Sequence, residues 1–246
     1  MKIAPKIILI EPVRDIFLRE HDFYVEQAKS RIFNNFKGEN IEKEAEKAKE
    51  DFFKREELEG HYGEDVDVAD IAETAIEHGI EFGITLYEMK FQVILATLAL
   101  MYHQWEKKLR EFMEHELRFG YNNDELEKIF WKSNIDCLYD ELERQGWYIR
   151  KEAWFPKIDA CRLIVNVYKH GKGPALGKLK EKHPEYLKGV FDVGDFFGEC
   201  DEMLLSYEDL SITIEDFNEI ADALRQFWVD FPSHQDQSKC DSDIPF

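Results

Sequence analysis

The sequence predicts an all-α fold, a helical bundle built around one long hydrophobic helix. Apolar residues recur at three- and four-residue steps through most of the chain, and no β-α-β alternation interrupts them. Only 13 Gly and 7 Pro occur in 246 residues, which is too few for a turn-rich β-sandwich. We expect one all-α domain with an N-terminal helical extension over residues 1–232, followed by a polar, disordered tail over 233–246.

The N-terminal part contains two expected helices. The first dozen residues are compatible with a short strand or an extended arm, and a helical pattern then runs from Arg14 to a stop at Gly38. Residues 41–58 are rich in Glu, Lys and Ala, and opposite charges recur there at four-residue spacing. This pattern predicts a second helix whose outer face is solvated.

A long apolar stripe defines the central helix. A helix can begin within residues 65–70, and its stripe includes Ile76, Phe82 and Met89 before it continues to Phe112. Because an unbroken helix over this whole span would exceed the usual globular length, a break is expected at Gly79 and Gly83. We therefore expect a very hydrophobic helix over about 84–117, with the core built around it.

The C-terminal part is expected to contain shorter helices. Pro156 is suited to the first turn of one of them and Gly171 to its end. Thr213 can open the last helix, and Pro232 ends it. The expected ranges are a helix near 126–146 interrupted at Ser133–Asn134, a helix over 156–170, a short helix over 176–187, an irregular loop over 190–210 and the last helix over 213–231.

The charge balance excludes some classes of function. The chain has 32 Lys and Arg against 52 Asp and Glu, a net charge of −20, so its surface as a whole repels nucleic acid. The four cysteines are widely spaced with no C-x-x-C, which favours unpaired thiols and a cytoplasmic protein. The longest uncharged stretch, residues 91–105, is shorter than the roughly 20 residues of a membrane span, so no membrane segment is expected.

Motifs for common cofactors do not occur in the sequence. There is no phosphate-binding loop, no dinucleotide fingerprint after a strand and no nucleophile elbow. Glu57 with His61 and Glu111 with His115 lie four residues apart, but such pairs are expected by chance among 52 acidic residues. We therefore expect no cofactor and no metal.

One basic segment stands apart from the acidic chain. Between Cys161 and Gly189 there are seven Lys and Arg against two Glu, a net charge of +5, so the rest of the chain carries −25. On a helix, Arg162, Asn166, Lys169 and His170 share a face about 100° wide, and apolar residues occupy the opposite face. The segment thus predicts a helix with one buried face and one polar, basic face.

These residue types are suited to RNA cleavage by the substrate's own 2′-hydroxyl. Arg162 and Lys169 can hold phosphate oxygens, and Asn166 can orient a polar group. His170 can transfer protons near neutral pH. Further substrate contacts are expected from Lys172 and Lys178. A second interpretation is structural: basic residues near a helix C-terminus interact favourably with its dipole, and Gly171 is then simply the helix cap.

The segment Arg162-x-x-x-Asn166-x-x-Lys169-His170-Gly171-x-Gly173, followed by Leu179 and Pro184, resembles the signature helix and loop of HEPN-type helical proteins. The resemblance implies a metal-independent endoribonuclease of a toxin–antitoxin or defence system. It also implies a homodimer that brings two sites together. Arg162 would stabilise the phosphate, Asn166 would be the polar helper and His170 the acid or base.

The spacing departs from the usual HEPN catalytic pattern. Arg162 is followed by Leu163 rather than by a polar residue, and seven residues separate Arg162 from His170. Some HEPN-type proteins are non-catalytic modules that bind RNA or a partner. The alternative hypothesis is therefore a non-catalytic helical interaction module, whose acidic surface is suited to a basic protein partner. A third hypothesis is a small-molecule or metal enzyme of the helix-bundle type.

Overall fold

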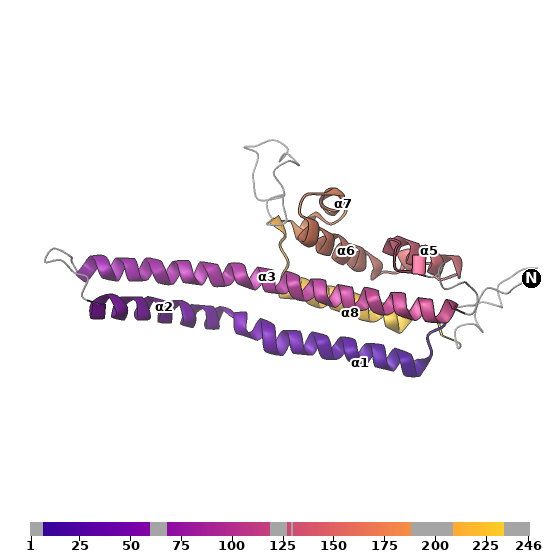
Figure 1. The fold of residues 1–246 in the computed structure, drawn as a ribbon, viewed down its shortest axis with the longest axis horizontal. Helices are drawn as coiled ribbons and strands as arrows, with labels where there is room; N and C mark the ends of the chain where they lie inside the picture. Colours follow the sequence, from indigo (N-terminus) through magenta and orange to yellow (C-terminus); the bar gives the residue numbers. More distant parts are fainter. Residues whose placement is uncertain (1–6, 60–67, 119–126, 129, 188–208, 234–246) are drawn as a thin grey trace, which may run out of the picture. The chain divides into compact units, whose positions relative to one another are not determined.

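The computed structural model describes residues 7–59, 68–118, 127–128, 130–187 and 209–233. The predicted all-α bundle with a long hydrophobic central helix is confirmed (Figure 1). The helices are α1 (Glu11–Gln27), α2 (Gly38–Glu59), α3 (Val68–Leu117), α5 (Ile135–Arg144), α6 (Phe155–His170), α7 (Pro174–Lys182) and α8 (Ile214–Asp230). One π-helical turn, Ala28–Ile32, and three short 3-10 turns, Phe33–Phe36, Ile149–Lys151 and Pro184–Tyr186, lie between them.

The contacts divide the chain into two compact units. Unit 1 comprises residues Met1–Val25 and Thr97–Phe246, and unit 2 comprises Glu26–Ala96. The α3 helix contributes its residues up to Ala96 to unit 2 and those from Thr97 to unit 1.

The predicted break in the central helix is wrong, because α3 is one continuous helix of 50 residues. A Cβ atom at Gly79 would lie 2.9 Å from the Cβ atom of Lys49 and 3.0 Å from the carbonyl oxygen of Ala45. At Gly83 the corresponding distance to the Cβ atom of Ala45 is 3.4 Å. These two glycines therefore let α2 and α3 approach closely within unit 2, rather than ending the helix.

Unit 2 contains an antiparallel pair formed by α2 and the first part of α3. Gly79 lies next to Lys49, and Gly83 lies next to Ala45. Residue numbers therefore decrease along α2 where they increase along α3, so the two helices are antiparallel. The two helices lie side by side in Figure 1. Several large apolar side chains of this part of α3 are exposed, including Ile76, Phe82 and Met89 of the predicted apolar stripe.

Unit 1 buries the second part of α3 against shorter helices. Leu98, Met101, Trp105 and Leu109 of α3 are almost fully buried. The ring of Trp105 meets Phe227 of α8 at a centroid distance of 4.9 Å and nearly at right angles. The α6 helix packs against both α7 and α8. The core predicted around the central helix therefore lies around its C-terminal part.

The helix ends follow the signals in the sequence. Thr213 and Asp216 form a reciprocal capping box at the start of α8. The α5 helix begins after Asn134, whose side chain accepts a hydrogen bond from the Asp136 backbone, so the interruption predicted there is confirmed. The short helix predicted to reach residue 187 ends earlier, at Lys182, because Pro184 lacks a backbone N–H and begins a separate 3-10 turn.

The ends of the described chain meet in unit 1. Residues 7–10 adopt no regular structure, and the backbone N–H of Leu9 donates to the carbonyl of Pro232 over 3.0 Å. Most of the loop expected over 190–210 and all but Ser233 of the tail expected over 233–246 lie outside the described residues.

Candidate functional site

The predicted polar face lies on α6. Pro156 occupies the first turn, and Gly171, with a φ of 64°, caps the C-terminus by donating its backbone N–H to the carbonyl of Val167. The apolar residues of the opposite face are buried: Leu163, Ile164, Val165 and Val167. The expectation of one buried and one polar face is met by this helix.

Arg162 makes an internal ion pair. Its Nε and Nη2 atoms lie 3.1 and 2.5 Å from the same carboxylate oxygen, Oδ1 of Asp159, and only 12% of the Arg162 side chain is exposed. Lys182 and His183, at the end of α7, lie 3.5 and 3.8 Å from the other oxygen, Oδ2. Burial alone would raise the pKa of Asp159, but the hydrogen bond and charge of Arg162 outweigh it, with help from Lys182, and lower that pKa. The contacts of Asp159 with Lys182 and His183 link α6 to the end of α7.

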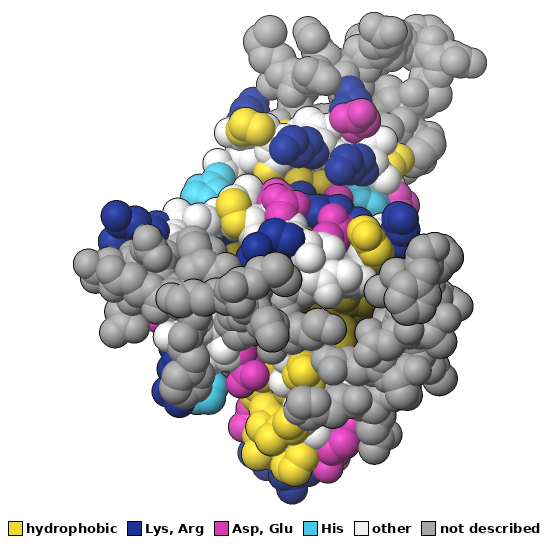
Figure 2. Space-filling view, turned by 90° about the vertical axis from the view of Figure 1, so that its right-hand side faces the viewer, with side chains coloured by type: hydrophobic (Ala, Val, Ile, Leu, Met, Phe, Trp, Pro, Cys, Tyr) yellow, Lys and Arg dark blue, Asp and Glu magenta, His cyan; other side chains and the backbone are white. Residues whose placement is uncertain are grey.

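The other predicted residues differ in accessibility. Asn166 is half-buried, whereas Lys169, His170, Lys172 and Lys178 are exposed around the connection between α6 and α7. In Figure 2, Lys and Arg side chains gather in the upper part of the described surface, at the height of α7, with acidic side chains among them. The structure thus keeps His170 and the three lysines on the surface and places the Arg162 guanidinium in an internal pair.

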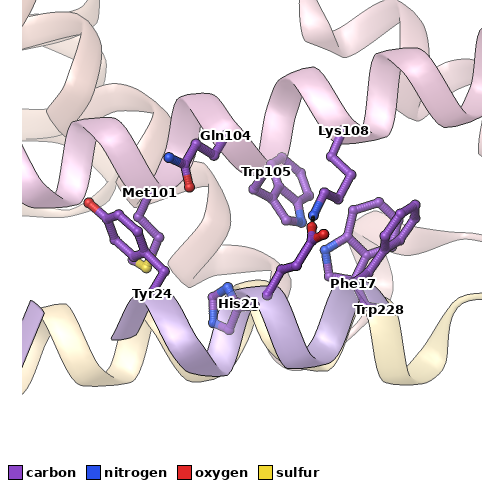
Figure 3. A pocket seen from close by; sticks show the side chains of 9 residues that line it. Phe17, His21, Tyr24, Met101, Gln104, Trp105, Lys108 and Trp228 are labelled. Carbon is purple, nitrogen blue, oxygen red and sulfur yellow. Dashed lines mark hydrogen bonds and ion pairs between the residues drawn. The ribbon is translucent and has the colours of Figure 1, made fainter. Parts of the chain in front are cut away.

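A small cavity lies between α1, α3 and α8 in unit 1. It has a volume of about 70 Å³, and its lining residues are Phe17, Glu20, His21, Tyr24, Met101, Gln104, Trp105, Lys108 and Trp228 (Figure 3). The ammonium of Lys108 pairs with the carboxylate of Glu20 and also lies 4.9 Å from the centroid of the Phe17 ring. The cavity combines aromatic walls with charged groups from two helices.

Burial affects two polar groups of this cavity, the imidazole of His21 and the indole N–H of Trp105. The Nε2 atom of His21 lies 2.9 Å from the carbonyl oxygen of Ala221, and burial lowers the pKa of the imidazole. Since a carbonyl oxygen only accepts, Nε2 carries the proton and donates. The residue Trp105 is 3% exposed, and its Nε1 donor has no acceptor among the described residues.

A wider apolar groove runs between α2 and α3 in unit 2. Its volume is about 580 Å³. On the α3 side, Ile76, Ile80, Ile84 and Tyr87 are 49, 58, 54 and 43% exposed. Their spacing places them on one face of the helix. On the α2 side the groove is lined by Ile41, Glu42, Ala45, Glu46 and Lys49.

Both edges of the groove are acidic. At 100° per residue, Glu77, Glu81 and Glu88 follow Ile80 and Ile84 around α3 on the side away from the two glycines. All three glutamates are exposed, as are Glu42 and Glu46 on α2. The Nζ atom of Lys49 is 2.6 Å from the carboxylate of Glu46, so this lysine is already paired. Unit 2 as a whole has 18 acidic against 9 basic residues, a net charge of −9.

Two further findings concern a metal site and a membrane-spanning helix. Among the described residues, no group of three or more His, Cys, Asp or Glu side chains is arranged to hold a metal ion. By length and composition alone, α3 is a helix that could cross a membrane; an 18-residue window of it has a mean hydropathy of 1.4, and 28% of that window is buried.

Comparison with known proteins gives no relative. No protein-family model, no curated protein and no solved structure matches the chain. The HEPN resemblance of the segment from Arg162 to Gly173 stays a prediction.

Sequence reasoning missed both the cavity and the groove. The groove had a signal, because Ile76, Ile80 and Ile84 recur at four-residue steps beside glutamates. The sequence prediction places Ile76 in the apolar stripe and Ile84 at the start of the hydrophobic helix, and it assigns no role to Ile80. The cavity had no sequence signal, since its residues come from three helices that are far apart in the chain.

Proposed function

We propose that this chain is a non-catalytic helical interaction module whose α2–α3 groove binds a basic, amphipathic helix of a protein partner. The observation that carries the proposal is the apolar floor of the groove between two acidic edges. An exposed stripe of isoleucines beside exposed glutamates offers burial to an apolar helix face and charge complementarity to Lys or Arg flanking it.

The dimensions of the groove suit a short helix. The stripe from Ile76 to Tyr87 covers eleven residue steps, about 16 Å at 1.5 Å per residue. An amphipathic helix of three to four turns presents an apolar stripe of about that length. A bilayer is a less suitable partner, because the exposed glutamates at both edges would have to approach or enter hydrocarbon.

The pairing of Arg162 argues against catalysis at α6. A residue that stabilises a scissile phosphate must present its guanidinium to the substrate. Here that group is mostly buried and held by Asp159. Opening this pair would leave the Asp159 carboxylate, which is only 13% exposed, without its main partner.

The proposal can be tested with designed peptides. An 18-residue Leu/Lys amphipathic helix and a Leu/Glu helix of the same pattern would be titrated against the whole protein by fluorescence anisotropy. We expect saturable binding of the Leu/Lys peptide and little binding of the Leu/Glu peptide. The Ile80→Glu/Ile84→Glu variant should weaken binding by about tenfold or more, since it places two charges on the groove floor.

A matched control lies on the same helix. Met89 is 52% exposed but faces away from the groove, so Met89→Glu should bind the Leu/Lys peptide like the wild type. Equal loss in both variants would show that any added charge weakens binding, and the groove assignment would then be wrong. The protein could also sediment with lipid vesicles. If the Ile80→Glu/Ile84→Glu variant lost this vesicle binding and Met89→Glu kept it, the groove would bind a membrane surface rather than a protein helix.

A second candidate function is contact with RNA phosphates without cleavage. It is supported by the exposure of Lys169, His170, Lys172 and Lys178 around one helix connection. The test measures binding and cleavage of a labelled RNA in the presence of a chelator. Lys169→Ala/Lys178→Ala should weaken binding and reduce its dependence on salt. Absence of salt-dependent binding in the wild type would remove this candidate. Cleavage that is lost in His170→Ala would restore the ribonuclease hypothesis.

A further inference from the structure

We propose that the cavity between α1, α3 and α8 binds a small carboxylate, held by the indole N–H of Trp105 and the ammonium of Lys108. This site lies in unit 1, is separate from the groove, and does not depend on the proposed partner binding.

The first argument is the missing acceptor of Trp105. Two other indoles of this chain donate to carboxylates at a distance of 2.8 Å: Trp131 Nε1 donates to Glu114 Oε2, and Trp154 Nε1 donates to Asp230 Oδ2. Trp105 is almost fully buried, yet its Nε1 donor has no acceptor among the described residues. A buried donor without an acceptor is costly, and a bound acceptor removes that cost.

The second argument is the position of Lys108. Figure 3 shows Lys108 one turn along α3 from Trp105, with both side chains directed toward α1. The ammonium of Lys108 is held there by the Glu20 carboxylate, which is 59% exposed, and by the face of the Phe17 ring. The carboxylate of Glu20 occupies the place at Lys108 that a ligand carboxylate would take. Glu20 would have to turn outward into solvent when a ligand binds.

The remaining walls limit the ligand to a few heavy atoms. A cavity of about 70 Å³ holds a handful of water molecules or one small acid. Phe17, Met101 and Trp228 supply apolar surface. His21 donates its Nε2 proton to the backbone of α8, and burial lowers its pKa below the ordinary 6.5, so Lys108 is the cation of the site at neutral pH.

The experiment follows the indole N–H resonances of the whole, nitrogen-15-labelled protein by NMR. Trp105→Phe identifies the Trp105 resonance, and the wild type is titrated with acetate, propionate and acetamide at constant ionic strength. We expect acetate and propionate to move the Trp105 resonance to saturation. Acetamide has the same shape as acetate without its charge, and should bind at least about tenfold more weakly. The resonances of Trp131 and Trp154 serve as internal controls and should not move.

A second variant keeps the test decisive if Trp105→Phe does not fold. Glu20→Gln removes the competing carboxylate and should tighten acetate binding severalfold, without any change in the core. The proposal is overturned if neither acid gives a saturable shift in the wild type or in Glu20→Gln. It is equally overturned if acetamide binds as well as acetate, because the site would then not select a charge.

Discussion

Asp159 and Arg162 lie one turn apart on α6, and both oxygens of the Asp159 carboxylate have basic residues as neighbours: Oδ1 faces Arg162, and Oδ2 faces Lys182 and His183. The arrangement makes the arginine of the predicted catalytic face the partner of Asp159, and the Asp159 carboxylate in turn links α6 to Lys182 and His183 at the end of α7. On this basic helix face, Arg162 therefore has a structural role as the ion-pair partner of Asp159.

Asp159→Asn should destabilise the protein by about 1–3 kcal/mol, because it leaves the mostly buried Arg162 charge with a neutral partner. Urea unfolding followed by circular dichroism measures the change. Asp140→Asn is the matched control: its carboxylate pairs with Arg150 but is 67% exposed, so its effect should stay within about 0.5 kcal/mol. Similar effects of the two substitutions would contradict the structural role of Asp159.

Gly79→Ala should lower the thermal unfolding midpoint, although alanine favours a helix by up to about 1 kcal/mol over glycine. The new Cβ atom would lie 2.9 Å from the Cβ atom of Lys49 and 3.0 Å from a backbone oxygen, so α2 would have to move. Gly83→Ala serves as control, because its nearest neighbour, the Cβ atom of Ala45, is 3.4 Å away. We expect that variant to be neutral or slightly stabilised. The reverse order of the two midpoints would disprove the close approach at Gly79.

Thr213→Ala should cost about 1 kcal/mol of unfolding free energy. It removes the Oγ1 acceptor that lies 3.0 Å from the backbone N of Asp216, at the start of α8. Thr213→Ser keeps this acceptor and should retain most of the stability. Chemical denaturation of the three proteins measures both effects. If alanine and serine prove equally stable, the capping box contributes nothing measurable.

His21→Gln should reduce the dependence of stability on pH below 6.5. Burial lowers the pKa of His21 in the folded protein from its ordinary value of 6.5, with the Ala221 hydrogen bond acting in the opposite direction. Below pH 6.5 the unfolded chain therefore binds more protons at this site, and stability falls until the folded-state pKa is passed. Glutamine keeps an N–H donor for Ala221 but does not titrate. Unfolding free energies between pH 5 and 8 test this. Parallel curves for the two proteins would contradict it.

The helices and their ends were largely predictable from the sequence. Pro156 and Gly171 bound α6 within one residue of the expected range, and Thr213 opens α8 as predicted. The apolar face of α6 was also predicted correctly, because a 3.6-residue period identifies which side of a helix is buried. Local signals of this kind act over a few residues, so one sequence suffices to read them.

The break at Gly79 and the pairing of Arg162 were not predictable in the same way. A glycine in a helix can end it or allow another helix to approach, and only the position of Lys49 in space distinguishes the two. Likewise, Arg162 lies on the polar face of α6 whether it is solvated or paired. Lys182 and His183, which complete the cluster around Asp159, come from a later helix and the turn after it.

The sequence alone determined the all-α class, most helix boundaries and the contrast between a basic segment and an acidic chain; the RNA chemistry of that segment's residues stays a prediction. The tertiary structure decided which of those residues stay accessible. It buried Arg162 against Asp159, left Ile80 and Ile84 exposed between acidic edges, and enclosed the Trp105 donor beside Lys108. The physical reason is that periodicity and propensity act along the chain, whereas the desolvation and pairing of a polar group depend on neighbours that only folding brings together.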